Sequence, residues 1–397
     1  MKNQFFTFTD TATLWLIVFC CLSIALPTAF MSISTILLMI FWILSGNFKA
    51  KLERIFGSPA AMAAIALFIM YAIGTIYSSA SWDYSLKFLL KYQKLLFIPL
   101  IISVMTSEKY RVYAINSFLI GMMSVLIISY LMWLGVIPHR VDLSQGYFVF
   151  KGRIAHNIFM SFALYLMMHR AIKNTGLHRY AWIVFSILAA LNIIFLVNGR
   201  TGQITMLVLI FWFIYEVWGI KKITYLVVLS LLSIALLQTL HELPHSRLTD
   251  IQQESAGGTS TSVGQRLEMY KNTLTLIKKH PVFGGGTGSL ENEYRIIAEQ
   301  ENSSLIRVPN SHNQFLLTTQ ELGIFGLALL LAMWALHWKA SYKTSEPQYG
   351  FALRGLVLTI VVGSLFNSLL LDAGEGKFYC VLAGVLLSSY TYKKTNS

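Results

Sequence analysis

The sequence predicts an all-α integral membrane protein, and three observations carry that prediction. The composition is 55% hydrophobic and 12% charged, with a mean hydropathy of +0.60, which is too apolar for a soluble chain of 397 residues to cover its core with polar surface. Apolar runs of about 17 or more residues recur from end to end, each long enough to cross the hydrocarbon layer as a helix. The net charge of +13 is gathered in alternate connections between these runs, as in multi-pass membrane proteins.

The apolar runs predict about twelve transmembrane helices. They lie near residues 12–28, 29–46, 60–78, 88–106, 112–135, 155–171, 180–197, 203–219, 223–240, 314–338, 351–370 and 376–391. No small-residue cleavage site separates the first two runs, so we expect a retained helix and not a signal peptide. The turn at Pro27-Thr28 is short enough that these two runs could instead form a re-entrant pair. Cys20, Cys21 and Cys380 all lie in apolar runs and offer neither a disulfide framework nor zinc-ligand spacing.

Lysine and arginine set the expected orientation. They collect after residues 46, 106, 170, 220 and 338 and at the C-terminus, which predicts that these connections and both termini are cytoplasmic. The opposite connections, expected to be periplasmic, are 79–87, 136–154, 198–202, 241–313 and 371–377. The chain therefore divides into an N-terminal transmembrane bundle at 1–240, a periplasmic loop at 241–313 and C-terminal transmembrane spans at 314–397.

The 241–313 loop is the longest polar segment. Its 254–260 stretch predicts a flexible connection, rich in Gly and Ser. An amphipathic helix follows, because Ser262 and Gln265 have capping-box spacing and one face is apolar. That face is formed by Val263, Leu267, Tyr270, Leu274 and Ile277. Pro281 and Gly284-Gly285-Gly286 end the helix. The run Gly284-Gly285-Gly286-Thr287-Gly288 predicts a flexible turn, and it lacks the Gly-Lys-Ser/Thr ending of a phosphate-binding loop, which argues against ATP.

Three arginines on the outer side run against the orientation bias. Arg200 lies in a tight turn between two apolar runs, Arg266 in the first turns of the amphipathic helix, and Arg153 at the end of the 136–154 connection. Each alone is compatible with contacts to lipid phosphates or with structural ion pairs. Together with His312 they indicate a site for a pyrophosphate, because guanidinium groups bind phosphate bidentately and stay charged.

His312 precedes the apolar run that starts at Phe315. Ser311 and Gln314 have capping-box spacing there. A helix N-terminus and neighbouring arginines both favour the neutral imidazole, which is the form that a general base requires. The alternative is a histidine that only bonds its own loop. The chain contains no Asp-x-Asp pair, which favours a site without metal, and no nucleotide or other cofactor is expected.

Two further polar motifs have competing interpretations. His241-Glu242-Leu243-Pro244-His245 matches a zinc-protease pattern, but Pro244 opposes the helix that would bring both histidines to one face. Asp372, Glu375 and Lys377 form the last outer connection. Their acidic groups are candidates for pairing with the arginines or binding a sugar, and mutual surface pairing is the alternative.

Four short motifs together resemble the O-antigen ligase family, within a superfamily that also holds O-antigen polymerases and protein O-oligosaccharyltransferases. They are Asn198-Gly199-Arg200-Thr201-Gly202, then Gly264-Gln265-Arg266-Leu267 leading to His280-Pro281-Val282-Phe283-Gly284, then Ser311-His312-Asn313-Gln314-Phe315 leading to Glu321-Leu322-Gly323, and finally Phe366-Asn367-Ser368 with Asp372 and Glu375. The resemblance covers the second half of the chain well, and the first half through the span pattern.

The resemblance implies a GT-C-type glycosyltransferase of the bacterial inner membrane with a periplasmic active site. The donor would be an undecaprenyl-pyrophosphate-linked polysaccharide and the acceptor a sugar of lipid A-core, among membrane lipids. On the matching positions His312 is the expected catalytic base, and Arg200 and Arg266 bind the pyrophosphate. Arg153, Asn313, Gln314 and Asp372 are expected to bind substrate. Two alternatives stay open: a polymerase that uses the same donor, and a transporter of an anionic solute.

Overall fold

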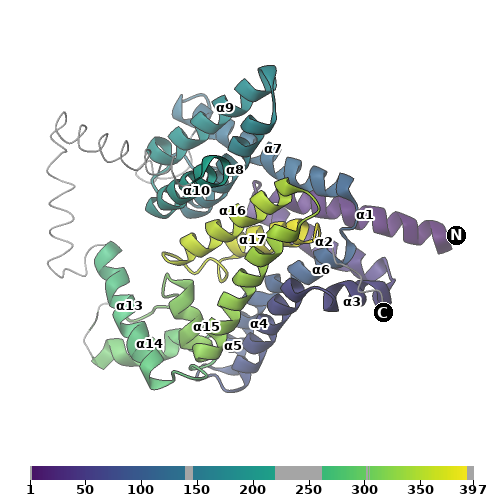
Figure 1. Cartoon of the computed structure of the whole chain (residues 1–397). Helices are drawn as coiled ribbons and strands as arrows, with labels where there is room; N and C mark the ends of the chain where they lie inside the picture. The colour runs from purple at the N-terminus through teal and green to yellow at the C-terminus, as the bar shows by residue number, and fades with distance from the viewer. Residues whose placement is uncertain (1, 139–145, 220–261, 301–302, 304, 391–397) are drawn as a thin grey trace, which may run out of the picture.

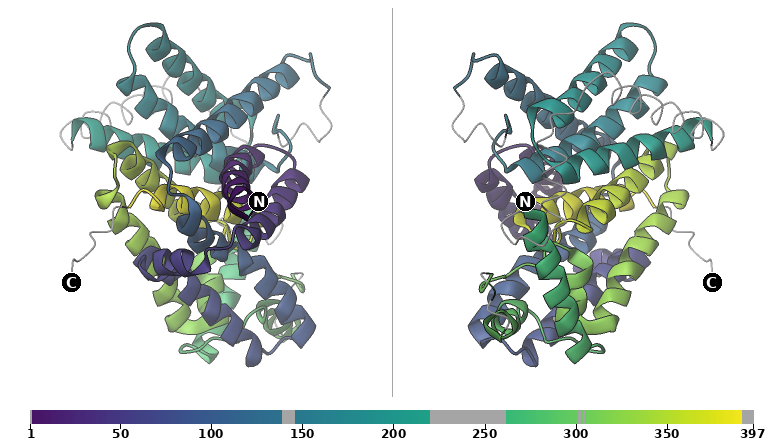
Figure 2. Two further views of the ribbon diagram at one scale, coloured as in Figure 1. Left: turned by 90° about the vertical axis from the view of Figure 1, so that its right-hand side faces the viewer. Right: turned by 90° about the vertical axis from the view of Figure 1, so that its left-hand side faces the viewer.

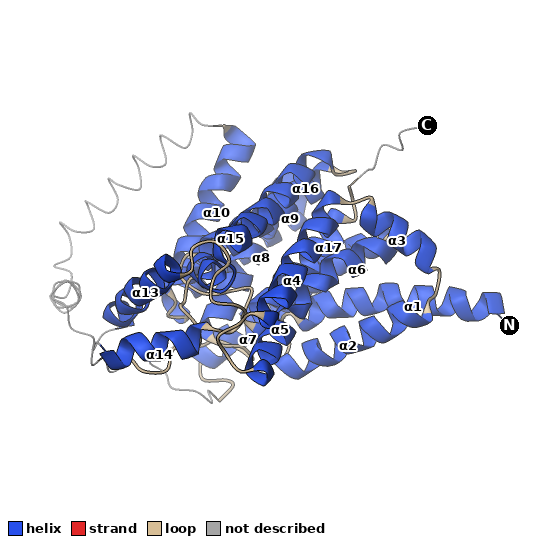
Figure 3. Ribbon diagram, turned by 90° about the horizontal axis from the view of Figure 1, so that it is seen from below, coloured by secondary structure: helices blue, strands red, loops and turns tan. Residues whose placement is uncertain are grey.

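The structure is a computed structural model that describes residues 2–138, 146–219, 262–300, 303 and 305–390. The described residues form helices joined by loops and contain no strand, as the sequence predicts (Figures 1 and 3). Two isolated bridges join Gly146 to Val197 and Thr344 to Tyr390. The predicted run at 223–240, the 254–260 connection and the His241–His245 motif lie outside the described residues.

The N-terminal third packs as hairpins of apolar helices. α1 (Lys2–Ser23) lies beside α2 (Thr28–Leu44) and α7 (Glu108–Trp133). The chain bends by 115° between α2 and α3 (Phe48–Phe56), and α4 (Pro59–Ile76) starts at the cap Ser58.

The run predicted as a single span at 88–106 is broken. α5 (Trp82–Tyr92) is followed by a 3-10 turn, η1 (Gln93–Leu96), and by α6 (Phe97–Val104). Pro99 supplies a reason, because it has no N–H to bond the carbonyl of Leu95.

A second group of helices forms the upper part of the molecule in Figures 1 and 2. It contains α8 (Arg153–Lys173), α9 (Gly176–Leu191) with the π-turn η3 (Asn192–Leu196), and α10 (Arg200–Trp218). α8 and α10 approach closely at Gly202, where an added Cβ would lie 2.2 Å from the Cβ of Asn157. This contact sets the N-termini of α8 and α10 next to each other.

The remaining helices are α13 (Ser262–Lys279), α14 (Leu290–Gln300), α15 (Gln314–Ala340), the 3-10 turn η4 (Ser341–Lys343), α16 (Pro347–Ser364) and α17 (Ala373–Leu387). α13 confirms the predicted helix, but the predicted apolar face is wrong. Leu267 and Leu274 are exposed, whereas Asn272, Thr273 and Leu276 are buried. The buried face lies about half a turn away, because α13 packs on α14 and α15 with a partly polar surface.

Among the residues that the structure describes, five helices are long and apolar enough to cross a membrane, or six if the bent pair α2 and α3 counts as one span. They are Pro59–Ile76, Glu108–Trp133, Gly176–Leu196, Arg200–Trp218 and Gln314–Lys343. Each predicted apolar run within the described residues contains helix, although the 88–106 run is broken and the 351–370 run leaves helix after Ser364. The protein is a multi-pass membrane protein. The total of twelve spans stays a prediction, since the other helices are shorter or more polar.

α15 is broken at Gly323, which has φ 64° and ψ −161°. The amide of Ile324 donates to the carbonyl of Pro281 instead of that of Gln320. The carbonyls of Gln320 and Glu321 accept instead from the amides of Gly285 and Gly286, at 2.8 and 2.9 Å. The 281–289 loop is therefore wedged into the break in α15.

The prediction of a flexible turn at Gly284–Gly288 is wrong, because these residues belong to the loop that fills the break in α15. Gly285, Gly286, Thr287 and Gly288 are buried. The amide of Thr287 also donates to the carbonyl of Gly74 at 3.0 Å, and that of Gly288 donates to the carboxylate of Glu321 at 2.8 Å. The glycines allow two backbones to pack closely. A glycine-rich motif is equally typical of a flexible turn, so the sequence alone does not show which of the two applies.

Candidate active site

His312 lies in a strained turn immediately before α15. Its φ of 52° is in the left-handed region, which is uncommon for a residue with a side chain. Its amide donates to Oδ1 of Asn310 at 2.9 Å, and this bond stabilises the turn. The N-cap of α15 is Asn313, whose Oδ1 accepts from the amides of Phe315 and Leu316. The predicted capping box of Ser311 and Gln314 is therefore wrong, and the hydroxyl of Ser311 donates to the carbonyl of Asn313 instead.

Three elements converge on His312. From α13, the hydroxyl of Tyr270 donates to the carbonyl of His312 at 3.2 Å. From the turn after α16, Asn367 is hydrogen-bonded to the imidazole, and its Nδ2 donates to the hydroxyl of Thr201 on α10 at 3.1 Å. Asn367 and Thr201 are buried, so the imidazole is tied through Asn367 to the start of α10.

The charge state of His312 follows from this environment. Burial lowers the pKa of the imidazole below its ordinary value, and the positive charge of Arg266 lowers it further. The hydrogen bond to Asn367 acts in the opposite direction. The lowered pKa favours the neutral form at pH 7, as the sequence predicts for a general base.

The three arginines are placed differently around this centre. Arg266 lies one helical turn before Tyr270 on α13, is half-buried, and acts electrostatically on His312. Arg200 and Arg153 are the exposed first residues of α10 and α8. An added Cβ on Gly199 would lie 3.7 Å from the carbonyl oxygen of Arg153, which confirms that the two helix starts adjoin. Arg200 precedes Thr201 and so lies beside the Asn367 link to His312.

Residues 185–331 match the family model described as O-antigen ligase. This part of the chain is similar to the O-antigen ligase family. It starts in α9 and ends within α15, so it contains Arg200, Arg266 and His312. No curated protein is similar enough in sequence to match the chain.

Three further candidates lie near the start of α15. Asn313 caps the helix and donates from Nδ2 to the carbonyl of Leu365 at 3.1 Å. Gln314 is fully buried, and its Oε1 accepts from the amides of Leu370 and Leu371 at 2.9 and 3.3 Å. The sequence predicts that Gln314 binds substrate. To do so, its side-chain oxygen would have to exchange the hydrogen bonds from Leu370 and Leu371 for bonds to the substrate. Gln314 thus sets the turn before α17 against the start of α15.

Asp372 lies at the end of that turn and begins α17 as its N-cap residue. Its carboxyl is partly buried, and burial raises its pKa. Its main-chain carbonyl accepts from Nζ of Lys94 at 2.6 Å. In the part of the chain that the structure describes, neither Asp372 nor Glu375 forms an ion pair with an arginine.

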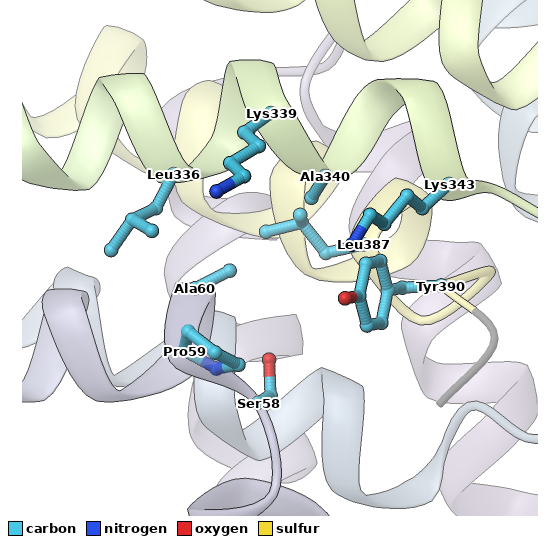
Figure 4. Close-up of a pocket in the computed structure, with 9 residues that line it drawn as sticks. All are labelled: Ser58, Pro59, Ala60, Leu336, Lys339, Ala340, Lys343, Leu387 and Tyr390. Atoms are coloured by element: carbon cyan, nitrogen blue, oxygen red, sulfur yellow. The ribbon is translucent and has the colours of Figure 1, made fainter. Parts of the chain in front are cut away.

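Within the described ranges, no group of three or more His, Cys, Asp or Glu side chains is placed to hold a metal ion. Figure 4 shows a cavity of about 230 Å³ where Lys339 and Lys343 approach the start of α4 at Ser58 and Pro59. These lysines belong to a connection that the sequence predicts to be cytoplasmic, and the length of α15 separates them from His312.

Sequence reasoning missed the partners that hold His312. Tyr270 was assigned to an apolar face, although its i,i+4 spacing from Arg266 places both on one side of the helix. Asn367 was noted only within the motif Phe366-Asn367-Ser368, and Thr201 only beside Arg200. The side-chain amide of Asn367 can be recognised in the sequence as a possible hydrogen-bonding group. Only the fold shows that it joins Thr201 to His312.

Proposed function

We propose that this protein is an O-antigen ligase, which transfers a polysaccharide from undecaprenyl pyrophosphate to a sugar of lipid A-core on the periplasmic side of the inner membrane. The observation that carries the proposal is the environment of His312. Its imidazole is half-buried, kept neutral by burial and by Arg266, and oriented by Asn367. A neutral, oriented imidazole beside several arginines suits proton removal next to a polyanionic leaving group.

The proposed reaction is a single displacement with inversion, as in GT-C-type glycosyltransferases. A hydroxyl oxygen of the acceptor attacks the anomeric carbon of the donor sugar, and the bond from that carbon to the pyrophosphate oxygen breaks. The electron pair leaves with undecaprenyl pyrophosphate, and the proton of the hydroxyl passes to His312. Arg266 and Arg200 stabilise the charge that develops on the pyrophosphate, and Arg153 extends the same cationic surface. No metal, nucleotide or covalent enzyme intermediate takes part.

The test is transfer by the purified protein in EDTA. Donor and lipid A-core are incubated with wild type, His312→Ala and Arg266→Ala, and the product is followed by gel. We expect transfer by wild type and its loss in both variants, with circular dichroism confirming that the variants are folded. Full transfer by His312→Ala would remove the base from the mechanism, and loss of wild-type transfer in EDTA would require a metal.

The same assay separates the polymerase alternative, because the two reactions differ only in the acceptor. Lengthening of the lipid-linked glycan without transfer to lipid A-core would identify a polymerase. Uptake of a labelled anionic solute into vesicles, independent of any acceptor, would instead support the transporter.

A further inference from the structure

A groove of about 640 Å³ lies next to the turn that holds His312. Pro309 and Asn310 form one edge, and Asp372 with its neighbours Leu371 and Ala373 forms another. The other walls come from α2, α5, η1 and α6, together with Lys377 of α17. Asn310 lines the groove and also accepts the hydrogen bond from the amide of His312, so a molecule in the groove would lie next to the His312 turn.

The groove is strongly cationic. Lys87, Lys91, Lys94 and Lys377 line it, against the single carboxyl of Asp372. Across the residues that the structure describes, no ion pair joins any of these lysines to a carboxylate. Lys94 is 3% exposed and donates to the carbonyls of Leu371 and Asp372. Lys87 and Lys91 are exposed, so their charges are available to an anion.

One wall of the groove is apolar. Ile36 and Met39 on α2 face it, together with Leu90 and Phe97. The exposed side of α2 continues this surface with Ile33, Ile40 and Ile43, each at least 45% exposed. Ammonium groups beside an exposed apolar helix suit an amphiphile that has an anionic head and a hydrocarbon tail. A free sugar or a soluble anion would leave the apolar wall unused.

We propose that this groove binds the phosphate-bearing lipid part of the acceptor. The inference rests on the proposed function and assigns the second substrate of the same site. The phosphate would contact Lys87 and Lys91, the hydrocarbon would lie along α2, and the attached sugar would extend past Asn310 to His312.

The donor suits Arg266, Thr201 and Asn367, none of which lines the groove. Arginine binds pyrophosphate bidentately, whereas ammonium groups act as point charges for single phosphates. The two substrates would then use different cations, arginine for the donor and lysine for the acceptor, and both would reach His312.

The test compares the double variant Lys87→Gln/Lys91→Gln with Lys278→Gln/Lys279→Gln. The control pair lies at the exposed end of α13, in the segment that contains His312, and removes the same charge outside the groove. Binding of lipid A-core is measured by native mass spectrometry in phosphatidylcholine nanodiscs without donor. At about 1 kcal/mol for each lysine, we expect the groove variant to bind about 30-fold more weakly and the control to match wild type.

Binding without donor is measured independently of transfer, so failure of the proposed function would leave this result interpretable. Competition separates the sources of phosphate: lipid A-core should remain bound in an excess of phosphatidylglycerol and of inorganic phosphate. Displacement by phosphatidylglycerol would identify a general site for anionic lipids and overturn the assignment. Unchanged binding of lipid A-core by the groove variant would also overturn it. Where transfer is observed, the KM for acceptor should rise in the groove variant while the KM for donor stays the same, and the reverse would assign the groove to the donor.

Discussion

Gly323→Ala tests whether the break in α15 holds the active-site turn in place. A Cβ at Gly323 would lie 2.1 Å from the carbonyl oxygen and 2.3 Å from the carbonyl carbon of Val282. Contacts under 3.0 Å are essentially never seen for a real Cβ, so the 281–289 loop must move by about 1 Å or more. The backbone conformation itself, φ 64° and ψ −161°, is almost restricted to glycine.

The expected loss of stability is about 4 kcal/mol. The backbone conformation contributes about 2 kcal/mol. Displacing the loop weakens three main-chain hydrogen bonds, from Ile324, Gly285 and Gly286, and each is worth about 0.5–1.5 kcal/mol. His312 stands at the start of this half of α15, so we also expect transfer activity to fall.

Gly135→Ala is the matched control. Gly135 has a φ of 75°, but a Cβ there meets nothing within 4 Å. Only the backbone term of about 1–2 kcal/mol then applies. Apparent unfolding midpoints of both variants and wild type are measured in detergent by circular dichroism at one heating rate, because such transitions are often irreversible. Equal unfolding midpoints for Gly323→Ala and Gly135→Ala would refute the conclusion that the 281–289 loop packs in the break of α15.

Three other predictions concern single side chains. Protonation of His312 should produce an acid limb in the pH profile of kcat/KM below the ordinary histidine pKa. Arg266→Gln should raise the pKa of the His312 imidazole because a nearby positive charge is lost, and this pKa is measured by NMR titration since transfer is expected to be lost. Asn367→Ala should lower the same pKa and reduce kcat, since its hydrogen bond raises the pKa of His312; pKa shifts of the same sign in both variants would contradict the geometry. Glu321→Ala should destabilise the protein by about 1–3 kcal/mol, because the amide of Gly288 loses its acceptor, whereas Glu321→Gln keeps an oxygen there; thermal midpoints that do not separate the two would argue against this bond.

The sequence predicted the helices well, because an apolar run must form helix inside a bilayer whatever its tertiary contacts. It predicted the break in α15 poorly. Gly323 lies in an otherwise continuous apolar run, and glycine is frequent in membrane helices without breaking them. The 281–289 loop that occupies the break is recognisable only from the hydrogen bonds that it makes.

The sequence predicts which residues form the candidate site, but not the contacts between them. The sequence distinguishes Arg266 as a cation on the expected outer side and His312 as a histidine before an apolar run, and the structure brings the two together. The lysines of the groove are not recognisable as one cluster from the sequence, since Lys377 is far along the chain from Lys87, Lys91 and Lys94. The face of α13 was wrong because a helix between two partly polar partners buries Asn272 and Thr273, which amphipathic periodicity assigns to solvent.

The exchange of main-chain bonds between α15 and the 281–289 loop also bears on how the chain enters the membrane. The first half of α15 alone would carry the unpaired carbonyls of Gln320 and Glu321, which are costly in hydrocarbon. The loop that pairs them precedes α15 in the chain, so it is synthesised before the helix that needs it. Docking of the loop and final seating of α15 are therefore a single step of biogenesis, and the His312 turn takes its shape only when that step is complete.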